Sequence, residues 1–119
     1  MSFCASGNFS GSALETAIRE AEAEGVIVVA SAGNCGYEQP SSSCQGYAGL
    51  TFPGSMQEVI SVGSVDENNA IAGFSSRGFV EGYGPKPDLV APGTNITSAW
   101  KNNAMMTESG TSMSAAIVS

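Results

Sequence analysis

The feature that most restricts the fold of this chain is a helix pattern followed at once by a run of β-branched residues. Apolar side chains recur at helical spacing within residues 12–24, at Leu14, Ala17, Ile18 and Ala21. Ser12 and Glu15 have the spacing of a capping box, and Gly25 is a natural helix end. Residues 26–29, VIVV, are typical of a strand buried on both faces of a sheet. Helix, short turn and buried strand form half of a βαβ unit, so the pattern predicts an α/β fold with a mainly parallel sheet.

More strands are expected further along the chain. A second buried strand is predicted at 58–65, EVISVGSV, with a turn at 66–69. Shorter strands are expected at 71–75, 89–91, 96–100 and 104–109. The last residues, TSMSAAIVS, begin a second helix. Because so few helices cannot cover both faces of a parallel sheet, we expect the layers to be incomplete in this chain.

Composition excludes several functional classes. The net charge is −7 with four Lys and Arg residues, which argues against nucleic-acid binding. No apolar run approaches the ~20 residues of a membrane span. The sequence has no His and no Cys-x-x-Cys pair, which argues against a zinc site. A nucleotide-binding domain would need a glycine-rich phosphate motif, and none follows a strand here.

Cys35 and Cys44 bracket a turn-rich loop, CGYEQPSSSC. Two interpretations stay open at this stage. In an oxidising compartment the two could form a disulfide, worth roughly 2–3 kcal/mol for so short a loop. Alternatively they are two free thiols in a flexible loop. If the two pair, Cys4 is left over.

Ser112 follows Gly110 and Thr111 where the last helix begins. A lone Gly-Thr-Ser favours an N-cap, whose side chain accepts a hydrogen bond from the first helical turn. The other interpretation is a nucleophile, because the N–H groups at a helix start stabilise developing negative charge. Gly110 would let a substrate carbonyl approach without a Cβ in the way.

Asn34 closes the segment VVASAGN after the first buried strand. Alone it is a turn residue. Its side-chain amide could also donate a hydrogen bond to an oxyanion. Ligands of open α/β sheets bind at the carboxyl ends of strands, which is where Asn34 lies.

Four blocks in order, VIVVASAGN, FPGSMQEVISVGSVDENNAIAGFSSRG, KPDLVAPGTNI and GTSMSAA, resemble the second half of a subtilisin-like serine protease catalytic domain. The resemblance implies a three-layer subtilisin-like α/β fold, incomplete in this chain, with residues 1–119 as one partial catalytic domain. That segment runs from the substrate-binding strand to the start of the nucleophile helix. The family often has a cis proline where this chain has Phe52-Pro53.

The resemblance also implies roles for single residues. Ser112 matches the nucleophile and Asn34 the oxyanion-hole asparagine. The residues matched to substrate binding are Ser2, Phe3, Cys4, Ala32, Gly33, Thr51, Phe52, Gly54, Gly110 and Thr111. The implied partner is a peptide or protein substrate, and a secreted or extracellular location is expected. No cofactor is required; calcium is frequent in the family, but no ligand cluster here identifies a site.

Two departures from the family pattern limit what the chain can do alone. The family's triad runs Asp, His, Ser. This chain has no His, and its two aspartates, Asp66 and Asp88, both follow the Asn34 block. We therefore assign them to a turn and a strand start. The family usually has Pro a few residues after the serine, where Ala115 to Ile117 stand here.

We therefore expect the C-terminal part of a serine endopeptidase domain, whose missing N-terminal part carries the Asp and the His. Alternatives are a catalytically silent module that binds a peptide or partner chain, and one half of a split protease. Isolated, the chain is expected to be marginally stable or prone to aggregation, because sheet edges and faces would be uncovered.

Overall fold

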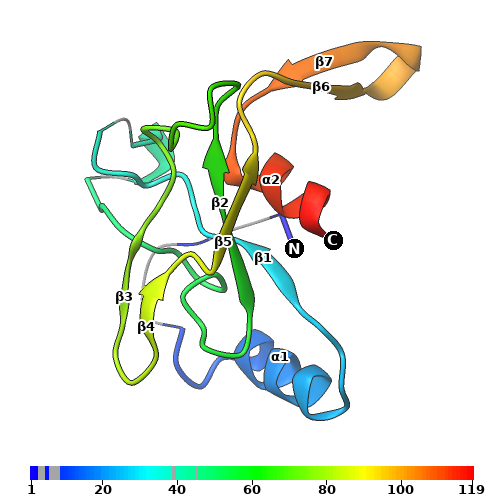
Figure 1. The fold of residues 1–119 in the computed structure, drawn as a ribbon. Helices are drawn as coiled ribbons and strands as arrows, with labels where there is room; N and C mark the ends of the chain where they lie inside the picture. Colours follow the sequence, from blue (N-terminus) through cyan, green and yellow to red (C-terminus); the bar gives the residue numbers. More distant parts are fainter. Residues whose placement is uncertain (3–4, 6–8, 39, 45) are drawn as a thin grey trace.

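The computed structural model describes residues 1–2, 5, 9–38, 40–44 and 46–119. Figure 1 shows two helices around a small central sheet, with a β-ribbon at each side. The helices and helical turns are α1 Ala13–Ala23, η1 Ser42–Cys44, η2 Lys101–Asn103 and α2 Thr111–Val118. The strands are β1 Val29–Ser31, β2 Ile60–Val65, β3 Gly78–Val80, β4 Gly84–Lys86, β5 Leu89–Pro92, β6 Ile96–Ala99 and β7 Met105–Glu108.

The central sheet has three parallel strands in the order β1-β2-β5. β1 pairs with β2 from Val29↔Ile60 to Ser31↔Val62, and β2 pairs with β5 from Val62↔Leu89 to Val65↔Pro92. The predicted α/β class with a parallel sheet is therefore confirmed. The carboxyl ends of β1, β2 and β5 lie at one edge, where the residues of interest follow them.

The two helices cover opposite faces of this sheet. On the α1 side, Ile18 packs in a cluster with Ala30, Phe52, Met56 and Val59. On the α2 side the core contains Val62, Ala91 and Ala115, with Val29 packed against them. Val29 and Ala30 are adjacent in β1, and adjacent residues of a strand point to opposite faces. The result is a helix–sheet–helix arrangement of three layers.

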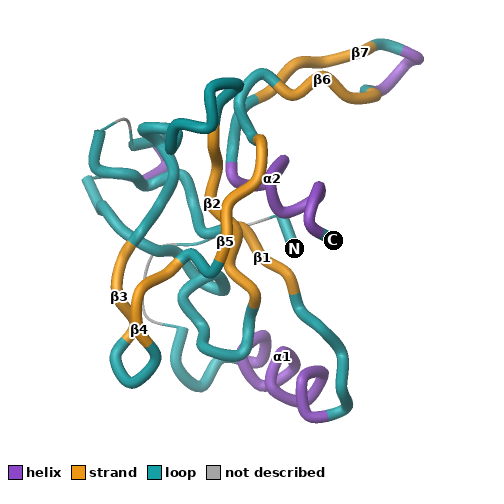
Figure 2. The backbone as a smooth tube through the Cα atoms, viewed as in Figure 1, coloured by secondary structure: helices purple, strands orange, loops and turns teal. Residues whose placement is uncertain are grey.

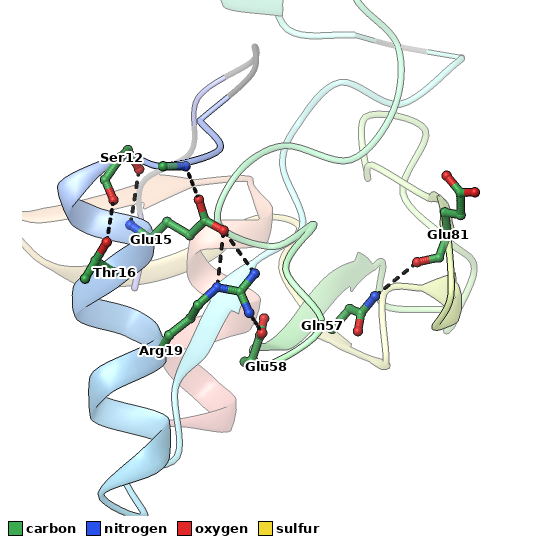
Figure 3. Close-up of polar contacts among 8 residues, drawn as sticks. Ser12, Glu15, Thr16, Arg19, Gln57, Glu58 and Glu81 are labelled. Carbon is green, nitrogen blue, oxygen red and sulfur yellow. Dashed lines mark hydrogen bonds and ion pairs between the residues drawn. The ribbon is translucent and has the colours of Figure 1, made fainter.

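Helix α1 begins and ends as its sequence predicts, with one difference. Ser12 is the N-cap and its Oγ accepts from the Glu15 N–H at 3.2 Å. The Glu15 carboxylate accepts from the Gly11 N–H at 2.6 Å, one residue before the position that a capping box uses. Arg19 pairs with Glu15 at 3.0 Å and also with Glu58, which ties the helix to the segment before β2 (Figure 3).

The expected strand at 26–29 begins later than predicted, at Val29. Gly25 takes a left-handed conformation with φ +83°, and the Val26 N–H donates to the Ala21 carbonyl in a Schellman-type helix end. Val26 and Ile27 connect this helix end to β1, and they are 55% and 77% exposed. Of the β-branched run 26–29, β1 therefore includes only the last residue, Val29.

The expected strand at 71–75 is also wrong. Ile71 makes one isolated bridge with Val65, and the Ser75 N–H then turns back to the Ala72 carbonyl. The segment turns because its serine hydroxyls serve other backbone groups: Ser75 Oγ accepts from Ser64 N–H and Ser76 Oγ from Cys35 N–H, both at 2.9 Å. The remaining predicted strands correspond to β2, β5, β6 and β7, shifted by up to two residues at their ends.

Two antiparallel ribbons flank the sheet, and Figure 2 shows the β6–β7 ribbon extending away from it. The sequence reading did not anticipate the β3–β4 ribbon, whose strands hold Gly78, Gly84 and Pro85. Such residues are depleted in strands, so propensity carried no signal there. The β6–β7 ribbon leads directly into α2 through Ser109 and Gly110.

The first residue extends the sheet beyond β1. The Met1 amino group donates to the Val29 carbonyl, and the Ser31 N–H donates to the Met1 carbonyl at 3.1 Å. This is the hydrogen-bond pattern of a parallel pair. It places Ser2 next to the start of α2, although the two segments are separated by more than a hundred residues of sequence.

Candidate active site

Ser112 is the second residue of α2 and does not cap the helix. The N-cap position is Gly110, which offers no side chain, so the capping interpretation of Ser112 is wrong. Ser112 Oγ donates instead to the Ser2 carbonyl at 2.5 Å, and Ser2 Oγ lies 3.5 Å from the Ser112 carbonyl. The N–H of the second helical residue has no partner within a helix. The Ser112 N–H therefore lies at the helix start without a helical partner, while the hydroxyl is hydrogen-bonded to Ser2.

Asn34 is joined to the residue directly before Ser112. Its Oδ1 accepts from the Thr111 N–H and from Thr111 Oγ1, each at 2.9 Å. Thr111 Oγ1 in turn accepts from the Gly33 N–H at 3.2 Å. Both hydrogen bonds from Thr111 end on Asn34 Oδ1, so they leave the Asn34 amide nitrogen as a donor. The amide and the helix start are thereby held together.

Two glycines permit this close packing. A Cβ on Gly110 would lie 3.2 Å from Asn34 Nδ2. Gly33 has φ +109°, and a Cβ there would come within 2.2 Å of Thr51 Oγ1. Gly33 therefore requires a residue without a side chain, and a side chain at Gly110 would crowd the Asn34 amide.

The residues matched to the substrate pocket lie along two joined segments. Thr51 N–H and Thr51 Oγ1 both donate to the Ala32 carbonyl, at 3.0 and 3.1 Å. Gly54 sits against the Ser31 carbonyl and the Ala32 Cα, where a Cβ would come within 2.4 and 3.0 Å. Phe52 is buried and stacks on Phe9 with 4.9 Å between ring centroids. Its side chain belongs to the core on the α1 side of the sheet.

The segment matched to the substrate-pairing strand is described only at its ends. Phe3 and Cys4 lie outside the described residues. Ala5 forms an antiparallel bridge with Phe52, with both N–H···O distances at 3.0 Å. The peptide bond Phe52-Pro53 is cis, as the family pattern implied.

Cys35 and Cys44 are joined in a disulfide with their Cα atoms 5.6 Å apart. It closes the loop that directly follows Asn34. Sequence reasoning missed two serines that hold this loop, Ser76 and Ser41. Ser76 Oγ accepts from the Cys35 N–H, and the Ser41 N–H donates to the Asn34 carbonyl. The Cys35–Ser76 contact joins residues 41 positions apart, so no local sequence pattern predicts it.

The two aspartates have structural surroundings. Asp66 Oδ1 accepts from the N–H groups of Asn68 and Ala70, both at 2.9 Å, and so shapes the turn after β2. Asp88 accepts from Lys86 Nζ at 2.8 Å, the Ser61 N–H at 2.7 Å and Tyr83 OH at 2.7 Å. Partial burial opposes ionisation of Asp88, but these three donors hold its pKa below the ordinary value.

Neither a metal site nor a membrane segment emerges from the described residues. They contain no group of three or more His, Cys, Asp or Glu side chains able to hold a metal ion. No helix among these residues is long and apolar enough to cross a membrane.

The family model of the subtilase family matches residues 1–119. Subtilisin DY of Bacillus licheniformis is 40% identical over 108 residues, which cover 90% of this chain and 35% of that protein. The thermostable alkaline protease of Halalkalibacterium halodurans is 35% identical over 108 residues, covering 90% of this chain and 26% of its own length. The chain thus spans about a quarter to a third of these relatives.

Among solved structures, the prenylagaramide maturation protease PagA superposes with a TM-score of 0.69 at 30% identity. The match covers 89% of this chain and 34% of that one. Sequence and structure comparisons therefore agree over nearly all of the chain. The chain belongs to the subtilase family, a family of serine proteases.

Proposed function

We propose that this chain is the nucleophile-bearing part of a serine endopeptidase, with Ser112 as the nucleophile and Asn34 as the oxyanion-hole donor. The observation that carries the proposal is the pair of hydrogen bonds from Thr111 to Asn34 Oδ1. They hold the amide next to the helix start that bears Ser112 and leave its nitrogen to donate.

The proposed reaction uses these groups in two steps. Ser112 Oγ attacks the carbonyl carbon of a peptide bond, and its proton passes to a base. The oxyanion that forms accepts from the Ser112 N–H and from Asn34 Nδ2. The C–N bond then breaks, the base returns the proton to the departing amine, and water hydrolyses the acyl-enzyme.

The base has to come from outside these residues, because the sequence contains no histidine. Ser112 Oγ donates a hydrogen bond to the Ser2 carbonyl, and a carbonyl oxygen is too weak a base to activate a serine. We therefore propose that the catalytic Asp and His belong to a further part of the same domain, or to a second chain.

The most direct test is covalent labelling. The full-length protein that carries this chain should react with a fluorophosphonate probe, and mass spectrometry should place the probe on Ser112. Ser112→Ala should abolish labelling. Ser98→Ala, which alters an exposed serine of the β6–β7 ribbon, should leave it intact. A folded full-length protein that fails to label would overturn the proposal.

The missing histidine favours one other function, a catalytically silent module that binds a peptide or a partner chain. The gene sequence upstream separates the two: an in-frame Asp block followed by a His-Gly block supports the protease. A split protease would show itself when this chain is mixed with a second chain carrying Asp and His. Peptide cleavage no greater than that of either piece alone would exclude it.

We also propose an extracellular location. The Cys35–Cys44 disulfide supports it, because disulfides persist in oxidising compartments and are rare in the cytosol. Quantifying free thiols in the protein isolated from its source would test this. Reaction of both cysteines with a thiol reagent after denaturation would contradict it.

A further inference from the structure

The backbone of Asn34 is held by a contact separate from those of its side chain. Its carbonyl accepts from the Ser41 N–H at 2.8 Å. Ser41 is seven residues further along, inside the loop that the Cys35–Cys44 disulfide closes. The position of the Asn34 peptide therefore depends on the path of that loop.

One end of the loop is firmly anchored to the body of the protein. The Cys35 N–H donates to Ser76 Oγ at 2.9 Å, and the Cys35 carbonyl accepts from the Gly49 N–H at 2.8 Å. The Gly36 N–H donates to the Phe74 carbonyl at 2.8 Å. A Cβ on Gly36 would come within 2.3 Å of the Gly73 carbonyl oxygen, so this end is also closely packed.

The other end is held by the disulfide and by backbone hydrogen bonds, among them the bond from the Tyr47 N–H to the Cys44 carbonyl at 2.8 Å. The Cys44 N–H donates to the Ser41 carbonyl at 2.9 Å, so Ser41 and Cys44 form one turn. Between the two ends, Tyr37, Glu38 and Pro40 are exposed. Cys44 Sγ lies 3.4 Å from the Asn34 carbonyl oxygen. The sulfur bridge thus brings the Ser41–Cys44 turn against the same carbonyl that Ser41 binds.

Both cysteines are deeply buried, with 4% of Cys35 and 2% of Cys44 exposed. A bridge that solvent and reductants reach poorly suits a permanent clamp better than a redox switch. Removing it would free the Ser41–Cys44 turn to move with the exposed part of the loop. The Asn34 carbonyl would then lose the bond from Ser41. The Asn34–Cys35 peptide would keep the bond from the Cys35 N–H to Ser76 Oγ but would gain freedom on its carbonyl side.

We propose that the Cys35–Cys44 disulfide positions Asn34 for catalysis by fixing the loop that binds its backbone. This inference rests on the proposed function, in which Asn34 stabilises the oxyanion. It assigns the two cysteines as positioning residues that act through Asn34 and do not touch the substrate.

A double-mutant cycle on the full-length protease tests the proposal. Cys35→Ala/Cys44→Ala should lower kcat about 10-fold with KM little changed, less than the 10²-fold that a 1 Å misplacement can cost. Asn34→Ala should lower kcat about 10²–10³-fold, the known effect of removing the oxyanion-hole asparagine of subtilisin. Adding the cysteine changes to Asn34→Ala should then change kcat less than about twofold, because their effect passes through the missing amide.

Ile18→Val is the matched control, because it weakens the core on the α1 side and leaves the Asn34 loop unchanged. It is expected to cost about 1 kcal/mol of stability and to leave kcat unchanged. Combined with Asn34→Ala, it should leave kcat at the value of Asn34→Ala alone. Additive losses for the cysteine pair, or unchanged kcat after its removal, would overturn the inference. An unchanged kcat in Asn34→Ala would instead overturn the proposed function itself.

Discussion

Thr111 donates two hydrogen bonds to one oxygen of Asn34, from its backbone N–H and from its hydroxyl, each at 2.9 Å. The hydroxyl also accepts from the Gly33 N–H at 3.2 Å. A single buried side chain therefore joins the segment after β1 to the start of α2. The orientation of the Asn34 amide follows from this arrangement, because both bonds from Thr111 end on its oxygen.

Thr111→Val should reduce kcat of the full-length protease about 10-fold, equivalent to one net hydrogen bond of about 1.4 kcal/mol. The isosteric change keeps the volume but removes one donor to Asn34 and the acceptor for the Gly33 N–H. Thr111→Ser keeps the hydroxyl and should stay within about threefold of the parent by the same reasoning. Steady-state kinetics on a peptide substrate measure both, and equal losses in the two variants would contradict the assigned role.

Gly93→Ala should destabilise the protein strongly. A Cβ there would lie 2.1 Å from Ser114 Oγ and 2.4 Å from Ser64 Oγ, between β2 and α2. Overpacking of this kind costs about 1–3 kcal/mol or more, seen as a lower midpoint of urea unfolding. Gly11→Ala is the comparison: its φ is +78° with open space around it, so only backbone strain of about 1–2 kcal/mol is expected. A smaller loss for Gly93→Ala than for Gly11→Ala would contradict the packing argument.

Stability should fall in acid partly through Asp88. Its pKa in the folded protein lies below the ordinary value of 3.8, so the unfolded chain takes up the proton at a higher pH than the folded one. The stabilisation is complete above the ordinary value and is lost as the pH falls through the lowered one. Asp88→Asn should therefore flatten this part of the curve of unfolding free energy against pH.

Tyr83→Phe provides a graded control for Asp88, because it removes only one of the three donors to the carboxylate. It should flatten the acid limb less than Asp88→Asn does. Denaturant unfolding at a series of pH values gives both curves. An acid limb that is equally steep in the parent and in Asp88→Asn would show that this carboxylate does not contribute.

The isolated 119-residue chain should aggregate through a groove of about 600 Å³ that is lined by Ile18, Ile27, Val28, Val118 and their neighbours. Exposed apolar surface of this kind promotes association. Ile27→Ser should raise the soluble fraction, measured by light scattering after purification. Ile71→Ser changes an isoleucine outside the groove that is 44% exposed, against 77% for Ile27, and should have a smaller effect. A sharp two-state thermal melt of the monomeric parent chain would contradict the prediction.

Local pattern was sufficient for the elements whose residues interact mainly with their neighbours. Helix α1 could be predicted because Ser12, Glu15 and Gly25 act within one or two helical turns. Strand β2 could be predicted because its side chains are buried over nearly its whole length. The same reasoning failed at Val26 and Ile27, which were predicted as strand but form the connection from the helix end to β1.

The sequence by itself determined the α/β class, the two helices, most strands and the candidate residues Ser112 and Asn34, because their signals are short and contiguous. Only the tertiary structure decided how these residues meet. The Thr111–Asn34 and Ser112–Ser2 contacts span 77 and 110 residues. Ser76 Oγ accepts from the Cys35 N–H, and the Ser41 N–H donates to the Asn34 carbonyl, so each contact involves a backbone group that almost every residue possesses. Such contacts depend on the path of the chain through the sheet, and no residue pattern records that path.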